Sequence, residues 1–309
     1  MIELPGPLAG ALHGLESDSL SRLEPAVRRL SERYRAGFPT DVLDRDDALA
    51  YVMYRMPATY AACAAALAAT SVALPGWAPT SVVDFGAGPG TAAWAATRAF
   101  PSIRDVTLVE RSEPMQAIGR ALAQDEPVLR DADWVRDVAV DADLIVASYA
   151  LGEAPSAEDA LWDAARDVLV VVEPGTPRGF RTLIAARSMG ISRGAHVAAP
   201  CPHDEACPMT QTSAWCHFSQ RLPRGAAHRA LKQASLPWED EKYSYVALSR
   251  TPAERASARV VGHPRFRKHL ARIPLCTREG LAERVVPKSD PTYRQARDVR
   301  WGDSFDETS

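Results

Sequence analysis

Cysteine is scarce in this chain, with five residues among 309, and aromatic residues make up only 7%. An odd, small number of cysteines argues against a framework of disulfide bonds, and we expect reduced thiols. The first residues show neither the basic and apolar segments of a secretory signal nor the Arg-rich pattern of a mitochondrial presequence. No apolar run of about 18–20 residues stands out, so no membrane span is expected. These absences favour a protein of a reducing cytoplasm.

Net charge is also nearly absent, at −3, but the charges are unevenly distributed. Residues 217–309 carry 18 Lys and Arg against 11 Asp and Glu, a balance of +7. Residues 1–216 carry 18 against 28, a balance of −10. A basic C-terminal third favours a polyanionic partner met on one side. A solvated surface of uneven composition gives the same count.

The first 78 residues predict a helical domain. Apolar residues recur at helical spacing over 8–36, and the Ala-rich stretch 41–74 also reads as helix. Pro57 lies inside that stretch, so we expect a break there and a second helix starting at the proline. The segment PGWAP at 75–79 reads as a linker.

From residue 79 to residue 250 the pattern predicts a doubly wound α/β domain. Short apolar runs, typical of strands buried on both faces of a parallel sheet, alternate with helical stretches. The predicted strands are 81–85, 106–110, 143–148 and 168–174, together with DWVR, which is the third strand along the chain. The predicted helices lie near 91–100, 114–124 and 157–166. A cysteine-rich insertion at 191–233 interrupts the domain, and 242–250 is expected to return as an antiparallel edge strand. Residues 251–309 read as a basic C-terminal extension.

The sequence VVDFGAGPGTAAW places Gly86, Gly88 and Gly90 between a strand and a helix. Such glycines let the backbone approach a ligand beside the free N–H groups of a helix N-terminus. The spacing is not the Gly-x-Gly-x-x-Gly of dinucleotide enzymes. Asp84 would repel a pyrophosphate but suits the cationic amino-acid end of S-adenosylmethionine, and Glu110 is placed to accept both ribose hydroxyls. We therefore expect S-adenosylmethionine here, with a nicotinamide site or an empty loop as alternatives.

Two further positions concern this cofactor. Asp137, after the third strand, is a candidate adenine contact, although a loop carboxylate is an equal alternative. Ser148 and Tyr149 follow the fourth strand, where base-amine methyltransferases carry an Asn/Asp/Ser-Pro-Pro-aromatic element. No proline pair and no Pro-Cys nucleophile occurs there. Methyl transfer requires mainly in-line positioning, so catalytic residues are left unassigned, with Ser148 and Tyr149 as the candidates.

Three of the five cysteines, Cys201, Cys207 and Cys216, fall within sixteen residues, in PCPHDEACPMTQTSAWCHF. Thiolates clustered among prolines are typical of metal ligands. The long gaps and Cys-Pro pairs favour an iron–sulfur cluster over zinc, which prefers cysteines two to four residues apart. Cys276 is a candidate fourth ligand, with a buried thiol in RIPLCT as the alternative. His203 and His217 are alternative ligands.

Several longer motifs carry a resemblance to a known family. They are DFGAGPGTAAWA, ASYALGE, EPGTPRGF, PCPHDEACP, WCHFSQRLPR, EDEKYSYVA and RQARDVRWGD. The pattern resembles the methyltransferase-like assembly factors of the mitochondrial small ribosomal subunit and their bacterial relatives, from about residue 34 almost to the C-terminus. Because no presequence is visible, we expect a bacterial, cytoplasmic member.

The resemblance implies a class I methyltransferase fold that binds S-adenosylmethionine and a 4Fe–4S cluster on Cys201, Cys207, Cys216 and Cys276. It also implies binding to small-subunit ribosomal RNA during assembly, through a basic surface. The candidate phosphate contacts are Arg221, Arg224, His228, Arg229, Lys232, Arg265, Arg267 and Lys268. A monomer is expected away from the ribosome. An active RNA methyltransferase is the alternative function, and a cluster-dependent redox or radical enzyme is a remote one, because radical enzymes leave one iron open on three close cysteines.

Overall fold

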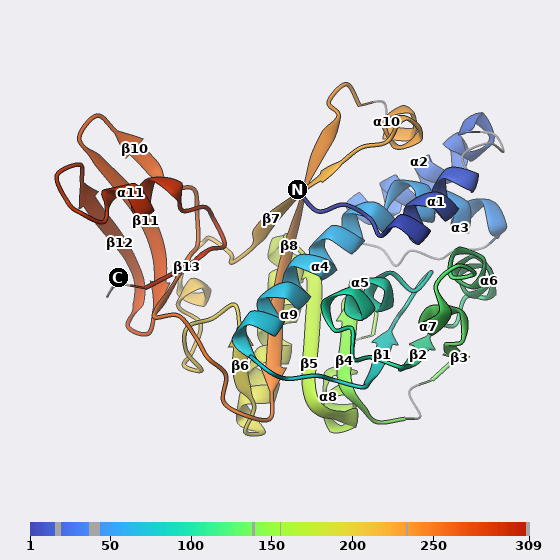
Figure 1. Cartoon of the computed structure of the whole chain (residues 1–309), viewed down its shortest axis with the longest axis horizontal. Coiled ribbons are helices and arrows are strands. Elements are labelled where there is room, and N and C mark those ends of the chain that lie inside the picture. Colours follow the sequence, from blue (N-terminus) through green and yellow to red (C-terminus); the bar gives the residue numbers. More distant parts are fainter. Residues whose placement is uncertain (16–19, 37–43, 138–139, 155, 233, 307–309) are drawn as a thin grey trace.

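The computed structural model describes residues 1–15, 20–36, 44–137, 140–154, 156–232 and 234–306. In this part of the chain the central feature is an eight-stranded sheet in the order β3-β2-β1-β4-β5-β8-β6, with β7 also paired to β8 (Figure 1). Strands β1 to β5 are parallel, and β8 runs antiparallel to its neighbours. The strands are β1 Ser81–Phe85, β2 Asp105–Val109, β3 Asp133–Val135, β4 Ala142–Ser148, β5 Ala165–Pro174, β6 His196–Ala199, β7 Phe218–Pro223 and β8 Trp238–Ser249.

The sheet separates two apolar cores, because successive side chains of a buried strand point to opposite faces. Val82 and Val170 belong to one core, whereas Val83 and Val171 belong to the other. Helices α4 and α5 cover the first face, and α8 and α9 cover the second. The helices of this domain are α5 Thr91–Ala99, α6 Glu113–Leu122, α7 Pro127–Arg130, α8 Glu158–Ala164, α9 Pro177–Ser192 and α10 Ala226–Lys232. The predicted doubly wound domain is therefore present.

The N-terminal helical layer consists of α1 Gly6–Leu15, α2 Leu20–Ala36, α3 Arg45–Tyr54 and α4 Met56–Ala73. Pro57 lies in the first turn of α4, where the missing N–H group costs nothing, as predicted. Asp44 caps α3 by accepting a hydrogen bond from the N–H of Asp47 at 2.9 Å. The first residues of the predicted helix 41–74 lie outside the described residues.

Helix α4 corrects the expectation that the chain has no long apolar run. Its 18 residues, Met56–Ala73, carry no charge and are apolar enough to cross a membrane by length and composition. In the fold, 61% of this stretch is buried, and α4 packs on α5, β7 and β8. A buried core helix meets the same criterion of length and composition, and Ala-rich helices are easily missed because alanine is weakly hydrophobic.

Two expectations about the end of the chain are wrong. The segment around 242–250 is not an edge strand: β8 lies between β5 and β6, so it is paired on both sides. The C-terminal extension is a folded, five-stranded sheet, within the described residues, instead of a tail. It contains β9 Ala258–Val260, β10 Arg265–Arg267, β11 Leu270–Thr277, β12 Gly280–Pro287, α11 Tyr293–Asp298 and β13 Ser304–Phe305.

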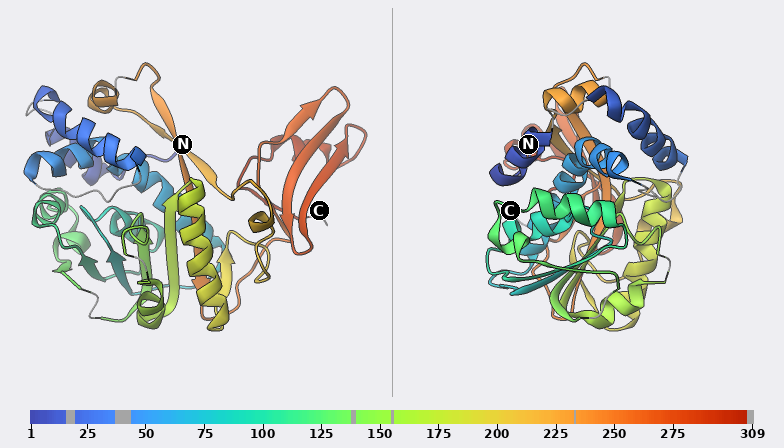
Figure 2. Two further views of the ribbon diagram at one scale, coloured as in Figure 1. Left: turned by 180° about the vertical axis from the view of Figure 1, so that it is seen from behind. Right: turned by 90° about the vertical axis from the view of Figure 1, so that its right-hand side faces the viewer.

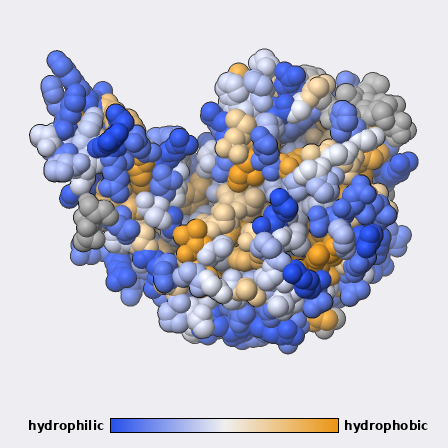
Figure 3. Space-filling view, viewed as in Figure 1, coloured by the Kyte–Doolittle hydropathy of each residue, from blue (hydrophilic) through white to orange (hydrophobic). Residues whose placement is uncertain are grey.

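One face of this C-terminal sheet is buried and the other is open. Ala271, Ile273 and Leu275 alternate along β11 and pack with Ala296 of α11 and with Phe305. Figure 1 and the left view of Figure 2 show that the sheet stands apart from the core, at the end of the molecule opposite the N-terminal helices. Hydrophilic side chains cover its projecting end in Figure 3. The last part of the basic third, residues 258–305, therefore forms a projecting unit of its own.

Candidate cofactor sites

The glycine loop joins β1 to α5 and has the backbone that its sequence predicts. Gly86, Gly88 and Gly90 all have positive φ angles, of 66°, 55° and 85°. A side chain at Gly86 would also place its Cβ 2.6 Å from the Cβ of Ala150, so the loop after β4 presses directly on it. Only glycine meets both requirements at this position.

Asp84 and Glu110 hold this loop from two strands. Asp84 is buried, and its Oδ2 accepts a hydrogen bond from the N–H of Ala93 in α5 at 2.9 Å. Burial, with a contribution from the charge of Glu110, raises the pKa of Asp84 to about 7. Glu110 follows β2 and accepts hydrogen bonds from the N–H groups of Gly88, at 2.8 Å, and Ser112, at 2.7 Å. Both carboxylates thus accept hydrogen bonds from backbone N–H groups in the glycine loop or close to it.

Two buried oxygen atoms beside the loop have no hydrogen-bond partner: Oδ1 of Asp84 and Oγ1 of Thr91, the first residue of α5. Buried polar groups are nearly always satisfied in folded proteins. A carboxylate oxygen and a hydroxyl at this position match a ligand that offers hydrogen-bond donors, such as an ammonium group. These two oxygen atoms therefore fit the ammonium group at the amino-acid end of S-adenosylmethionine.

The other candidates for this site lie differently. Asp137 is 76% exposed and pairs with Arg111 at 2.8 Å, so its side chain is on the surface. Ser148 ends β4, and its Oγ lies 3.1 Å from Sγ of Cys63 in α4. Tyr149 has a positive φ of 57°, an unusual conformation for a bulky residue. Its hydroxyl donates to Oε1 of Glu241 at 2.9 Å.

Arg55 completes a contact that links the helical layer to this region. It precedes α4, pairs with Glu241 of β8 at 2.9 Å, and its guanidinium lies 5.8 Å from the centre of the Tyr149 ring. Both charged side chains are 11% exposed. Sequence reasoning missed the pairing of Arg55 with Glu241, because the two residues are 186 positions apart and the motif EDEKYSYVA, which contains Glu241, does not indicate its partner. The two side chains considered for catalysis are therefore both in contact with neighbouring protein groups.

The four candidate thiols come from distant parts of the chain and meet between the core and the C-terminal sheet. Cys201 and Cys207 lie between β6 and β7, Cys216 lies two residues before β7, and Cys276 is on β11. Burial raises the pKa of Cys207, Cys216 and Cys276, the last to about 12, and neighbouring thiols add to each shift. The pKa of Cys216 responds to all three of the others. The fold thus brings the four thiols within electrostatic range of one another.

The thiols are not arranged as a ready-made single-ion site. In the part of the chain that the structure describes, no group of three or more His, Cys, Asp or Glu side chains is placed to hold a metal ion. A tetrahedral zinc site needs sulfur atoms within about 4 Å of each other, since each Zn–S bond is about 2.3 Å. The expected bound metal is therefore not shown by the geometry.

Buried donors without partners surround the thiols. They are Nδ1 of His203, Nε of Arg187 and Nε1 of Trp301. The Nε2 atom of His203 lies 3.8 Å from Sγ of Cys276. Trp301 packs edge-on against His217, the neighbour of Cys216, with ring centres 4.6 Å apart. Unsatisfied donors beside electron-rich sulfur atoms fit an anionic group at this position.

Three of the expected phosphate contacts are instead inside the protein. Arg224 and Lys232 pair with Glu239 of β8 at 2.8 and 2.6 Å, and His228 lies 3.5 Å from the same carboxylate. These four side chains are between 7% and 16% exposed. Burial, with a contribution from the nearby cations, lowers the pKa of His228 to about 4. We correct the expectation for Arg224, His228 and Lys232: the three side chains are directed at Glu239 and not at solvent.

The remaining basic candidates are exposed. Arg221 pairs with Asp240 at 2.7 Å, and Arg229 lies on the outer side of α10. Arg265 and Arg267 are on β10, with Lys268 in the turn that follows. Arg265, Arg267, Leu270 and Arg272 line a pocket of about 360 Å³ on the open face of the C-terminal sheet. Glu283 partly neutralises it by pairing with Arg265 and Arg272, each at 2.5 Å.

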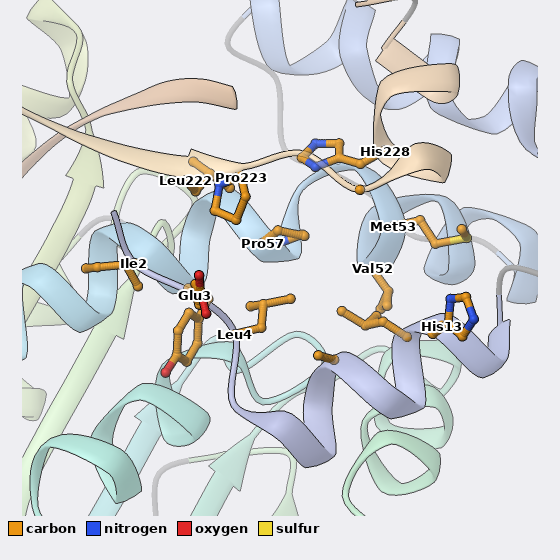
Figure 4. Close-up of a pocket in the computed structure, with 14 residues that line it drawn as sticks. Ile2, Glu3, Leu4, His13, Val52, Met53, Pro57, Leu222, Pro223 and His228 are labelled. Carbon is orange, nitrogen blue, oxygen red and sulfur yellow. The ribbon is translucent and has the colours of Figure 1, made fainter. Parts of the chain in front are cut away.

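A second pocket, of about 320 Å³, lies between α1, α3, α4 and β7 (Figure 4). Ile2, Leu4, Val52, Met53 and Leu222 give it a mainly apolar lining, with His13 and His228 near its edge. None of its lining residues belongs to the glycine loop or to the thiol cluster. It is separate from both candidate cofactor sites.

The sheet order extends the dinucleotide-binding order 3-2-1-4-5 with an antiparallel strand inserted before the last one. Together with the glycine loop at the end of β1, this defines a class I methyltransferase-like fold. A family model described as "Mitochondrial small ribosomal subunit Rsm22" matches residues 45–306. The chain therefore belongs to this family, as its motifs predict.

Curated relatives agree with that assignment. The chain is 29% identical over 290 residues to the ribosome assembly protein METTL17, mitochondrial, of Homo sapiens, an alignment that covers 82% of this chain and 61% of the relative. It is 25% identical over 327 residues to the Rsm22-cox11 tandem protein 2, mitochondrial, of Schizosaccharomyces pombe, covering 83% and 43%. The chain thus spans about three fifths or less of the relatives' lengths. Both relatives are mitochondrial proteins, which contradicts the expected bacterial, cytoplasmic location.

Solved structures of methyltransferases resemble the chain more distantly. A protein described as a putative RNA methyltransferase from Pyrococcus horikoshii is 14% identical, with a TM-score of 0.39, and the match covers 63% of this chain and 86% of that one. Magnesium protoporphyrin IX methyltransferase from Synechocystis, solved with bound S-adenosylmethionine, is 12% identical with a TM-score of 0.38, covering 71% and 90%.

Proposed function

We propose that this chain is a methyltransferase-like assembly factor of the small ribosomal subunit. In this proposal it binds S-adenosylmethionine at the glycine loop, holds a 4Fe–4S cluster on its four clustered cysteines and contacts ribosomal RNA through its C-terminal sheet. The observation that carries the proposal is the family match over residues 45–306. The human relative's name describes a ribosome assembly protein.

The glycine loop supports the cofactor part of the proposal. Asp84 and Thr91 each offer a buried oxygen without a partner at the N-terminus of α5. Burial raises the pKa of Asp84 to about 7. A ligand ammonium group beside Asp84 would favour the ionised carboxylate. Glu110, now bonded to the N–H groups of Gly88 and Ser112, is the nearby acceptor for ribose hydroxyls. We assign no cofactor contact to Asp137, which pairs with Arg111 at the surface.

The thiol cluster supports the iron–sulfur part. Four thiols in mutual range cannot all ionise without a cation, and thiolates are the form that binds iron. The cluster itself is proposed from the family resemblance, because in the described residues no group of three or more His, Cys, Asp or Glu side chains is placed to hold a metal ion. The unpartnered donors of His203, Arg187 and Trp301 are suited to hydrogen bonds with cluster sulfur.

The geometry favours a binding function over catalysis. Ser148 is in contact with Cys63, and Tyr149 is held by Glu241. Helices α3 and α4 cover this end of the sheet, and the ring of Tyr51 lies about 4.0 Å from the Cβ position of Gly88. A target base would have to displace these contacts to reach a methyl group. We therefore propose that the bound cofactor stabilises the fold by mass action instead of donating its methyl group.

Calorimetry with S-adenosylmethionine tests the cofactor site. The Asp84→Asn variant is expected to weaken binding at least tenfold, because the ammonium group loses its carboxylate. Asp137→Asn serves as the matched control and is expected to bind as the wild type does. Equal affinity for wild type and Asp84→Asn would remove the proposed orientation of the cofactor.

Anaerobic purification followed by iron, sulfide and zinc analysis tests the thiol site. About four iron and four sulfide per chain are expected, together with co-sedimentation of the protein with small ribosomal subunits. One zinc without sulfide would replace the cluster by a structural ion. Failure to sediment with either subunit would remove the assembly role.

A further inference from the structure

Arg259 joins the segments that carry two of the thiols. It lies on β9 directly opposite Cys276 of β11 in the antiparallel register. Its Nε donates to the carbonyl oxygen of Pro200, the residue before Cys201, at 2.9 Å. A second nitrogen donates to the carbonyl of Gly302 at 3.1 Å. One guanidinium therefore connects the C-terminal sheet to the beginning of the cysteine loop.

Arg187 performs a similar task from the core. It is on α9, is 3% exposed, and one of its terminal nitrogens donates to the carbonyls of His203 and Glu205, at 2.9 and 2.7 Å. Both carbonyls lie between Cys201 and Cys207. In the described part of the chain, both arginines donate to backbone carbonyls, and neither forms an ion pair with a carboxylate.

Both arginines lie beside the segments that carry the thiols. Arg259 is paired in register with Cys276, and the carbonyls that Arg187 binds lie between Cys201 and Cys207. Arg187 is buried and Arg259 is half-buried, and a positive charge withdrawn from water without a carboxylate partner is costly unless an anionic group is nearby. A cluster held by four thiolates is such a group.

We propose that Arg187 and Arg259 are the positioning and countercharge residues of the four-thiol site. They fix the position of the loop 201–207 relative to strand β11, and they stabilise the negative charge of the occupied site. The inference rests on the proposed cluster and goes beyond it, because it assigns the site's electrostatics to two residues outside the ligand set. Hydrogen bonding and charge around the sulfur atoms are among the factors that set the potential of a cluster.

The test uses the full chain, purified anaerobically, with arginine variants of two kinds. Arg187→Met and Arg259→Met remove the charge, whereas Arg187→Lys and Arg259→Lys keep it. Arg250→Met is the matched control, because Arg250 also donates to two backbone carbonyls, those of Ala165 and Trp162, each at 2.8 Å, but near no thiol. Iron and sulfide content, visible absorption and the midpoint potential are measured for each.

The methionine variants are expected to retain several-fold less iron and sulfide than Arg250→Met, and the cluster that remains is expected to have a more negative midpoint potential. The lysine variants should return the potential toward the wild-type value with incomplete recovery of content. Content and potential equal to those of Arg250→Met in all four variants would overturn the countercharge role while leaving the cluster intact. A wild-type protein without iron and sulfide would overturn the cluster and this proposal together.

Discussion

Two basic segments of this chain look alike in sequence but differ in the fold. In the first, residues 221–240, Arg224, Lys232 and His228 converge on Glu239 and are mostly buried. In the second, residues 265–283, the arginines lie on the open face of a projecting sheet and line a pocket. A count of charges locates the cations in the sequence, but it does not tell whether they face solvent or pair with a buried carboxylate. The first segment therefore contributes to stability, whereas the second is exposed and is the surface on which we propose RNA contact.

The largest expected effect concerns the carboxylate at the centre of the first segment. Glu239→Gln leaves Arg224 and Lys232 nearly buried without a counter-charge, and we expect it to lower the free energy of unfolding by about 3 kcal/mol. Chemical denaturation monitored by circular dichroism measures the change. Asp240→Asn is the adjacent control, because Asp240 pairs with Arg221 at the surface, where ion pairs contribute little. Equal losses for both variants would show that the burial of the first segment is unimportant.

The next effect is the pH dependence that His228 contributes. The pKa of His228 is about 4 in the fold, against 6.5 for a free side chain. The unfolded chain therefore takes up a proton at His228 at a higher pH than the folded one, so the contribution of His228 to stability falls as the pH decreases from about 7 to about 4, whereas buried Asp84, with a pKa of about 7, acts in the opposite direction. The loss amounts to about 3 kcal/mol if His228 acts alone.

Glu239 acts in the same direction, because its ion pairs keep its pKa below the ordinary value and its contribution is also lost as the pH falls. Thermal unfolding below pH 4.5 tests the effect of Glu239, and thermal unfolding between pH 7.5 and 4.5 tests that of His228. His228→Asn should remove the contribution of the histidine, which the difference from the wild-type curve measures over this range. An unchanged curve would contradict the buried, neutral state of the histidine.

A smaller effect is expected for the second segment, on binding and not on stability. Arg267→Gln should weaken binding to small-subunit RNA by about threefold to tenfold and reduce the slope of log K against log salt by about 1, as for the loss of one phosphate contact. Filter binding at several salt concentrations measures both quantities. Arg229→Gln, which removes the exposed cation of α10, is the matched comparison. A larger loss of affinity for Arg229→Gln would place the RNA-binding surface on the first segment instead.

The smallest effect is expected for Arg265→Gln. Glu283 keeps its second partner, Arg272, so the melting temperature should not change measurably. RNA binding should decrease less than for Arg267→Gln, because Arg265 shares its charge with Glu283 in the free protein. A pronounced drop in melting temperature would mean that this face, like the first segment, depends on its ion pairs for folding.

Local patterns predicted the parallel core well. The strand at 81–85, the glycine loop and the helix after it follow from apolar runs and glycine positions within about twenty consecutive residues. The prediction failed where partners are distant in sequence. The alternating segments LARIPLCT and GLAERVVP, joined by a turn at Gly280, do indicate a hairpin, but the basic composition drew the interpretation toward a tail.

The sites show the same limit. The residues of the glycine loop are close in sequence, so their meeting could be predicted from the strand–turn–helix pattern. The thiol cluster requires Cys276 to reach a loop about sixty residues earlier, and only the family resemblance supplied that link. Glu239, Arg187 and Arg259 could not be found from the sequence, because a lone charged residue has no periodicity and its partner is fixed only by tertiary packing.

The contacts of strand β8 constrain its length during evolution. Within six residues it carries Glu239 for the buried cations, Glu241 for Arg55 and Tyr149, and Ser244, which donates to the carbonyl of Cys216 at 2.7 Å. Because neighbouring strand residues face opposite sides, a single inserted or deleted residue would exchange the faces of everything beyond it. Such a frame change would disturb the helical layer, the loop after β4 and the thiol site at once. Length variation among relatives should therefore be tolerated in the loops on either side of β8 and be selected against within the strand.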